Sequence, residues 1–218
     1  MKKVFSATSE TIELSEFFFV SGNLSLDFIN TQIVENNAPK DLLTDFSEFV
    51  RWTAAANLLE KSKTEKLIAD WDSRKEIKDV FGQVINFRRI LREMFTDLAK
   101  GKVVNKISIE AINEEIKNQS GTIEIRKADT GFEKIFRAAF QEPRQLLSPI
   151  AESAADLLCY GNPAYIKKCE SSECVLYFYD TTKNHSRRWC SMAGCGNRAK
   201  AAAFYQRRIE KSKICESE

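Results

Sequence analysis

Four cysteines near the end of the chain have the residue type and spacing of a zinc site. They form two pairs, Cys169 with Cys174 and Cys190 with Cys195, and each pair encloses four residues. Thiolates presented two by two from tight turns can close a tetrahedron around one Zn²⁺, with Zn–S distances of about 2.3 Å. Because such a site has no open coordination position, it holds structure and performs no hydrolysis. The spacing therefore predicts one structural zinc ion.

The start of the chain carries no signal for export. Its longest apolar run, residues 17–20, is short, and acidic Glu10, Glu13 and Glu16 precede it in place of a basic segment. No stretch approaches the roughly 18 apolar residues that a membrane helix needs. We therefore expect a cytoplasmic protein with no membrane partner, in a reducing compartment where paired cysteines bind metal more often than they form disulfides.

The remaining candidates for chemistry are few. His185 is the only histidine of the chain, and no pair of catalytic carboxylates is evident, so we expect no enzyme. His185 is interpreted as a polar turn residue, since it could bind zinc only by displacing a cysteine. Cys159, on the apolar end of a helix, is expected in the core, and Cys215 is expected to be exposed.

Positive charge is concentrated around the cysteines. Residues 1–164 hold 22 Lys or Arg against 25 Asp or Glu, whereas residues 165–215 hold 11 against 4. Four thiolates with Zn²⁺ carry −2, which still leaves this tail at about +5. A basic surface of this kind suits phosphates, and a helix can enter the major groove of DNA. The predicted nucleic-acid contacts are Lys183, Arg187, Arg188, Asn197, Arg198, Lys200, Arg207 and Arg208.

Other interpretations of the tail remain open. Asn197 can cap a helix and Arg198 can bond to carbonyls of the cysteine turn, without any contact to nucleic acid. The same basic surface suits RNA as well as DNA. A protein-interaction module would instead expose Val175, Tyr177, Tyr179 and Trp189. Basic neighbours also lower thiol pKa values, so a zinc-thiolate redox sensor is a further alternative.

The sequence before the cysteines is typical of a mainly α-helical domain with a small β-hairpin element. The longest helical period covers residues 74–100, which we expect to be the central helix. Period-two alternation over residues 122–126 predicts a short strand or hairpin. Gly161-Asn162-Pro163 then breaks the chain, which places a domain boundary between residues 1–162 and 163–218. Further helices are expected over residues 24–34, from 44 or 45 to 58, over 108–118, and from 148 onward.

The C-terminal module has its own expected order of elements. A cysteine knuckle over residues 169–174 leads to a strand over 175–180, a turn, and a returning strand over 187–190. A helix over 197–211 follows, favoured by its alanines. This order is that of a treble-clef zinc finger. About fifty residues bury too little surface to fold alone, so the metal must supply much of the folding free energy.

At these residues the chain resembles a known family. Arg188-Trp189-Cys190-Ser191-Met192 followed by Cys195-Gly196-Asn197-Arg198 is similar to the CGNR zinc finger, and residues 26–31, Leu-Asp-Phe-Ile-Asn-Thr, resemble the signature of the ABATE domain that usually precedes it. The resemblance covers nearly the whole chain. It implies a stress-related bacterial transcription regulator whose zinc finger binds DNA. We further expect the N-terminal domain to sense a ligand or to mediate self-association, for example as a homodimer.

A second site is conceivable in the N-terminal domain. On a helix, Asp27, Asn30 and Thr31 share one face, and Arg92, or one of its neighbours Arg88 and Arg89, could pair with Asp27 across the core. One interpretation is a buried polar network that fixes two helices. The alternative is a pocket for a small effector, bound by Asp27, Asn30, Thr31 and Arg92.

Overall fold

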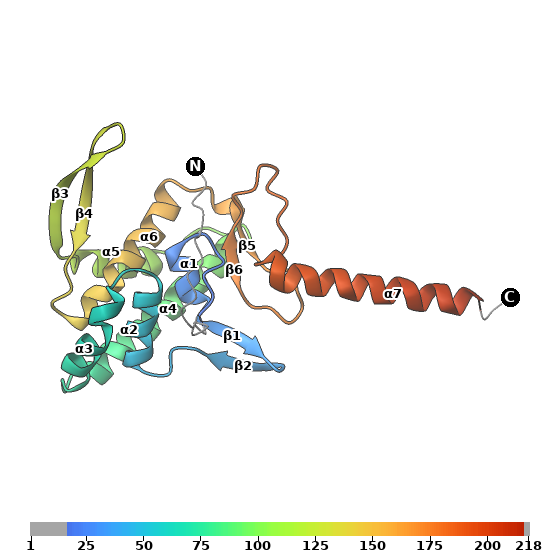
Figure 1. Cartoon of the computed structure of the whole chain (residues 1–218), viewed down its shortest axis with the longest axis horizontal. Coiled ribbons are helices and arrows are strands. Elements are labelled where there is room, and N and C mark those ends of the chain that lie inside the picture. The colour runs from blue at the N-terminus through green and yellow to red at the C-terminus, as the bar shows by residue number, and fades with distance from the viewer. Residues whose placement is uncertain (1–16, 216–218) are drawn as a thin grey trace.

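A computed structural model describes residues 17–215 of the chain, with side chains described as far as residue 209. About half of the chain is helical, and the rest includes three antiparallel two-stranded hairpins (Figure 1). The α-helices are α1 (Leu24–Ile29), α2 (Phe46–Ala55), α3 (Lys61–Asp72), α4 (Ile77–Leu98), α5 (Lys106–Lys117), α6 (Ser148–Cys159) and α7 (Asn197–Cys215). The strands are β1 (Gln32–Glu35), β2 (Ala38–Asp41), β3 (Gly121–Ala128), β4 (Gly131–Ala138), β5 (Ile166–Lys168) and β6 (Tyr177–Tyr179).

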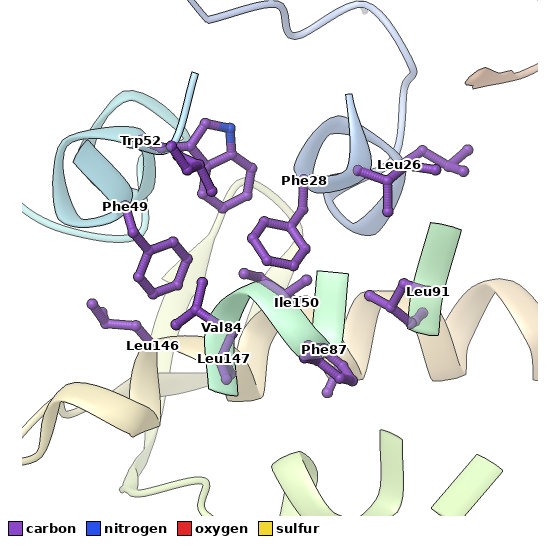
Figure 2. Close-up of a cluster of buried hydrophobic side chains, with 14 of the residues drawn as sticks. Leu26, Phe28, Phe49, Trp52, Val84, Phe87, Leu91, Leu146, Leu147 and Ile150 are labelled. Carbon is purple, nitrogen blue, oxygen red and sulfur yellow. The ribbon is translucent and has the colours of Figure 1, made fainter. Parts of the chain in front are cut away.

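Helix α4 is the centre of the N-terminal part, as its helical period predicts. Its apolar residues recur every three or four positions and are buried, including Val84, Leu91 and Phe95. Helices α1, α2 and α5 pack against it. In Figure 2, Phe28 from α1 and Trp52 from α2 lie over this core, and their rings are 5.3 Å apart. Each such buried side chain contributes about 1.5–3 kcal/mol through the hydrophobic effect.

The helix predicted over residues 24–34 was wrong in its second half. Helix α1 ends at Ile29, and the hairpin β1–β2 follows, with Glu35 paired to Ala38. The two residues between them, Asn36 and Asn37, have φ angles of 50° and 61°. Positive φ at both central residues is the requirement of a type I′ hairpin turn, which asparagine tolerates. The turn overrides the helical period that Ile33 continues in the sequence.

The other predicted helices are confirmed, with small shifts of their ends. Asp45 caps α2, since its carboxylate accepts a hydrogen bond from Glu48 N. Helix α3 was not predicted, because its sequence is largely polar and has few apolar residues at helical spacing. In the structure, only Thr64, Ile68 and Trp71 of this helix are buried. The predicted strand at 122–126 is confirmed as part of the longer β3–β4 hairpin, which projects from the body (Figure 1).

The C-terminal module begins with the hairpin β5–β6. The predicted strand at 175–180 is confirmed as β6, but its partner is β5, which lies before the first cysteine pair. The predicted returning strand at 187–190 was wrong: these residues form no strand, because Asp180 instead bends the chain by accepting hydrogen bonds from Thr182 N and Arg187 N. Helix α7 starts at Asn197 as predicted and projects from the body (Figure 1). The treble-clef order stays a prediction.

Direct hydrogen bonds join the module to the helical body. Asn30 Nδ2 donates to Tyr177 O at 2.8 Å, and Tyr177 N donates to Asn30 Oδ1 at 2.8 Å. Arg92 donates to Ile29 O at 2.7 Å and to Val175 O at 3.1 Å. Asn30 is 1% exposed, so the side chain completes a buried backbone ladder between α1 and β6. The two parts of the chain are therefore held in one orientation.

None of the helices within residues 17–215 combines the length and apolar character needed to cross a bilayer.

Replacing Asn30 by alanine tests the junction between the module and the body. Asn30→Ala removes two hydrogen bonds and leaves Tyr177 N–H and C=O buried without partners, which costs about 2–4 kcal/mol of unfolding free energy. Denaturant unfolding followed by tryptophan fluorescence measures the change. Asn113→Ala, at an exposed position of α5, is the matched control and should change stability by less than about 0.5 kcal/mol. Equal stability of the two variants would contradict the assigned role of Asn30.

Candidate metal centre and basic helix

The four cysteines meet at one buried point. Cys169 and Cys174 flank the turn after β5, while Cys190 and Cys195 flank the turn before α7, and all four sulfur atoms lie within 4.8 Å of one another. Cys190 Sγ is 3.7 Å from Cys174 Sγ and 3.6 Å from Cys195 Sγ. A Zn–S distance of about 2.3 Å places tetrahedral sulfurs about 3.8 Å apart, so the spacing fits Zn²⁺. This is the geometry of a four-thiolate zinc site.

Without metal, hydrogen bonds and burial shift the pKa values of Cys169, Cys174 and Cys190. The hydrogen bond from Cys190 lowers the pKa of Cys174 to about 5. The same bond raises the pKa of Cys190, because it favours the protonated thiol. Burial raises the pKa of Cys169. The Cys174 thiolate thus forms readily, whereas Cys169 and Cys190 need a cation beside them to lose their protons, and bound Zn²⁺ deprotonates its thiol ligands outright.

Cys195 lies on a single turn of π-helix, Met192–Gly196, that leads into α7, and Cys190 lies two residues before that turn. Ser191 caps this turn, since its hydroxyl accepts from Gly194 N. A Cβ atom at Gly196 would lie 2.8 Å from Met192 Sδ and 3.1 Å from the Trp189 ring, so a side chain there would displace the end of the Met192 side chain.

Arg198 reaches back from the first turn of α7 to the metal site. Its Nη2 atom lies 3.1 Å from Cys195 Sγ, and this hydrogen bond raises the pKa of the guanidinium. A second donor, Cys190 N, lies 3.3 Å from Cys169 Sγ. Donors of this kind stabilise thiolate charge and orient the ligands. The sequence left open that Arg198 bonds to carbonyls of the cysteine turn. Arg198 does bond to this turn, but its acceptor is the Cys195 sulfur and not a carbonyl.

Arg187 is directed inward, contrary to its predicted place on a nucleic-acid surface. Its guanidinium donates to Trp189 O at 2.9 Å, to Val20 O at 2.8 Å and also to Cys190 O. It also lies over the Phe178 ring, 4.2 Å from the centroid. These contacts occupy the guanidinium, so it ties the second cysteine turn to the N-terminal part.

The loop between the cysteine pairs is built around a buried carboxylate. Burial alone would raise the pKa of Asp180, but hydrogen bonds from Lys167, Thr182 and Arg187 hold it well below its usual range. Lys167 Nζ lies 2.7 Å from Asp180 Oδ2. His185 has a φ angle of 46° and stacks on Tyr165 with ring centroids 3.5 Å apart. His185 is therefore a turn residue outside the metal cluster.

The other predicted nucleic-acid residues are exposed. Arg188 pairs with Glu170 at 2.6 Å and lies over the Trp189 ring. Lys183 lies in the loop, whereas Asn197 is at the start of α7, where Nδ2 is 3.4 Å from Ala193 O. Lys200, Arg207 and Arg208 lie along the projecting part of the helix.

The apolar surface of the protein-interaction alternative is not present. Tyr177 is 5% exposed, and Val175, Tyr179 and Trp189 are partly buried. Tyr177 packs in the core of the helical body. Cys159 was also predicted wrongly, since it is exposed and not in the core, while the side chain of Cys215 falls outside the described residues.

The polar face around Asp27 forms bonds within the chain. Asp27 Oδ1 accepts from Val20 N at 3.1 Å and from Ser21 N at 2.9 Å, so the expected pairing with Arg92 was wrong. Burial raises the pKa of Asp27 to about 6, although these hydrogen bonds oppose the shift.

Arg88 pairs with two other members of the polar network. Sequence reasoning missed its role: the guanidinium is 1% exposed and donates to Thr31 Oγ1 at 2.7 Å and to Asp41 at 2.5 Å and 2.7 Å. Asp41 belongs to β2, so the ion pair holds the β1–β2 hairpin on α4. The predicted effector residues Asp27, Asn30, Thr31 and Arg92 thus all have partners in the chain.

Zinc content tests the metal centre. Serine at any one of Cys169, Cys174, Cys190 or Cys195 should reduce bound zinc from one equivalent to little or none, and a strong chelator should unfold the module. Elemental analysis of purified protein and circular dichroism measure these changes. Cys159→Ser, which alters an exposed thiol outside the cluster, should keep full zinc. Retention of zinc by two or more of the four ligand variants would contradict the site.

The two adjacent arginines should differ in their effect on stability. Arg187→Ala removes three hydrogen bonds to carbonyls and should lower the unfolding free energy by about 2 kcal/mol or more. Arg188→Ala breaks an exposed ion pair and should cost about 0.5 kcal/mol or less. Thermal unfolding of the zinc-loaded proteins measures both. Equal effects would show that Arg187 does not tie the module together.

Comparison with known families covers both parts of the chain. The CGNR zinc finger matches residues 165–208, and the ABATE family, described as "Putative stress-induced transcription regulator", matches residues 22–161. A search of curated proteins finds no match. Zinc is thus supported by the family as well as by the four clustered sulfurs. Because its ABATE match covers more than half of the 218 residues, the protein belongs to the ABATE family and carries a CGNR zinc finger.

Proposed function

We propose that this protein regulates transcription by binding DNA through its zinc finger, with α7 as the main contact. The carrying observation is that α7 stands clear of the body and presents basic side chains directly after the metal ligands (Figure 1). All side chains of residues 201–209 are exposed. An α-helix with side chains is about 10–12 Å across, which matches the width of the major groove of B-DNA.

The charges of α7 favour one side of the helix. Lys200, Arg207 and Arg208 lie within one half of the helical circumference, at spacings of seven and eight residues. No acidic residue occurs between Asn197 and Ile209. A one-sided row of cations can follow a line of phosphates, while Asn197 and Arg198 at the start of the helix are placed near the body. This arrangement supports phosphate contact along the helix.

The aromatic residues of α7 add contact surface. Phe204 is 52% exposed and Tyr205 is 64% exposed, without partners in the helical body. The Arg208 guanidinium lies 5.9 Å from the Phe204 centroid. Exposed rings beside cations also suit unpaired bases, so RNA is the alternative nucleic acid. Duplex DNA is favoured because a straight, isolated helix fits a major groove, whereas the deep, narrow major groove of A-form RNA excludes side chains.

In this proposal the N-terminal domain holds the zinc finger in a fixed orientation. The four side chains expected to bind an effector bond to the chain itself, so the proposal does not depend on them. Asn30 instead holds β6, and Arg92 holds Val175 just before β6, so both fix the finger on the helical body. We assign no catalytic step to either part. Control of DNA binding would act by changing this junction or the metal site.

Salt dependence of binding tests the proposal. The triple variant Lys200→Ala, Arg207→Ala, Arg208→Ala should bind duplex DNA more weakly, with a shallower slope of log affinity against log salt. The slope should fall by about 0.9 for each phosphate that the variant no longer neutralises. Fluorescence anisotropy with labelled duplex DNA measures the slope. Alanine keeps the helix, so folding should not change.

The matched control removes cations elsewhere. Lys61→Ala, Lys63→Ala, Lys66→Ala deletes three lysines of α3 and should leave the slope unchanged. Equal slopes for the two triple variants, or tighter binding to structured RNA than to duplex DNA, would overturn the proposal.

A further inference from the structure

The β3–β4 hairpin is a ribbon that the rest of the described chain leaves uncovered. Every residue of β3 except Ala128 is exposed, and the two strands pack mainly on each other. Ile125 is 77% exposed and Phe132 is 79% exposed. A two-stranded ribbon alone is at best marginally stable in water, and an open strand edge tends to pair with another chain. The ribbon therefore has an open strand edge and exposed apolar side chains that another chain could cover.

The two faces of the ribbon differ in character. On one face, Glu124 pairs with Arg137 and Arg126 pairs with Glu133, across the two strands. The other face is apolar apart from two lysines. Its cross-strand pairs are Ile123 with Phe136, Ile125 with Lys134, and Lys127 with Phe132.

We propose that two copies of this chain associate by antiparallel pairing of their β3 strands, centred on Ile125, to form one four-stranded sheet. A strand that pairs with its own copy must do so about a two-fold axis. With Ile125 on the axis, residue 124 lies opposite residue 126 of the other copy, and 123 lies opposite 127. The sequence of β3 is complementary to itself in this register.

The charged face carries the first part of this complementarity. Glu124 lies opposite Arg126 of the second copy, and the reverse pair forms across the axis. Across the four strands, the charged side chains then follow in the order Arg137 on β4, Glu124 on β3, Arg126 on β3 of the second copy and Glu133 on β4 of the second copy. Signs alternate at every step, so the intrachain ion pairs extend into the interface. Opposite charges directly across strands stabilise the pairing.

The apolar face carries the second part. Ile125 lies opposite Ile125 of the other copy on the axis, which buries two β-branched side chains together. Ile123 lies opposite Lys127 of the second copy, whose aliphatic stem covers the isoleucine while its amine reaches solvent. A one-residue shift would place Glu124 opposite Ile125, and a two-residue shift would place Glu124 opposite itself. The pattern therefore favours a single register.

The outer edge of the ribbon belongs to β3. In Figure 1, β3 lies on the side of the ribbon away from the helices. An approaching copy therefore meets β3 first. Pairing of this type depends on β3 alone and not on zinc or nucleic acid, so its test is independent of the proposed DNA binding.

Cysteine cross-linking tests the register directly. In a Cys159→Ser, Cys215→Ser background with zinc bound, Ile125→Cys should form an intermolecular disulfide under mild oxidation, because directly opposed residues have Cα atoms about 4.5–5.5 Å apart. Lys127→Cys alone should not cross-link, since its two copies lie four residues, or about 14 Å, apart along the strands at 3.4 Å per residue. A mixture of Ile123→Cys and Lys127→Cys proteins should cross-link with each other. Non-reducing electrophoresis reports all three.

Sedimentation gives a second measurement without added cysteines. Ile125→Lys places two like charges on the axis and should shift the protein to monomer, whereas Phe132→Lys on β4 should leave the dimer. Each variant also places a lysine opposite a lysine of the neighbouring strand, Lys134 or Lys127, so the two variants perturb the hairpin alike and differ in the strand that carries the new charge. A monomer at all concentrations would overturn the proposal, as would cross-linking through Ile135→Cys in place of Ile125→Cys, or equal cross-linking of Ile125→Cys and Lys127→Cys.

Discussion

Convergence of four buried sulfur atoms on one point is the constraint on which the rest of the finger depends. Thiolates so close together repel one another, and burial adds a desolvation cost, so a divalent cation is needed between them. The donors from Cys190 N and Arg198 offset part of the remaining charge. Because the second cysteine turn runs straight into α7, the metal also fixes where that helix begins. Zinc therefore sets the direction of α7 as well as the fold around it.

The finger does not depend on the metal alone, because it shares packing with the ABATE domain. Leu176 and Phe178 cover the cysteines, together with Val20 and Ile33 from the N-terminal part. Arg187 adds a bond to Val20 O, and Asn30 completes the backbone of Tyr177. A small module lacks the buried area for a large core of its own. Packing against residues of the helical body gives the metal site a rigid support.

Local features of the sequence predicted most of the structure, and long-range contacts account for the errors. The cysteine spacing and the period of α4 are local, so the zinc site and the central helix were predicted correctly. In the sequence, Arg187 looks like any other arginine of the basic tail. Its acceptor Val20 O lies 167 residues away, and no local pattern indicates that contact. Asp27 likewise found backbone donors in place of Arg92. The pair Asn36–Asn37 is a turn signal in the sequence. The helical spacing of the apolar residues before it led us to extend the predicted helix to residue 34 instead.

Helix α7 shows how a segment with little tertiary support can still be ordered. Isolated helices shorter than about 12–15 residues are marginal in water, so a projecting helix needs strong intrinsic propensity. The alanines at 199 and 201–203 supply it, while the π-turn and Arg198 anchor the first turn to the metal site. A helix already formed before contact loses less conformational entropy on binding than a disordered basic tail. The same charge on a flexible segment would bind phosphates more weakly, which is a physical reason for joining a basic helix directly to a zinc ligand.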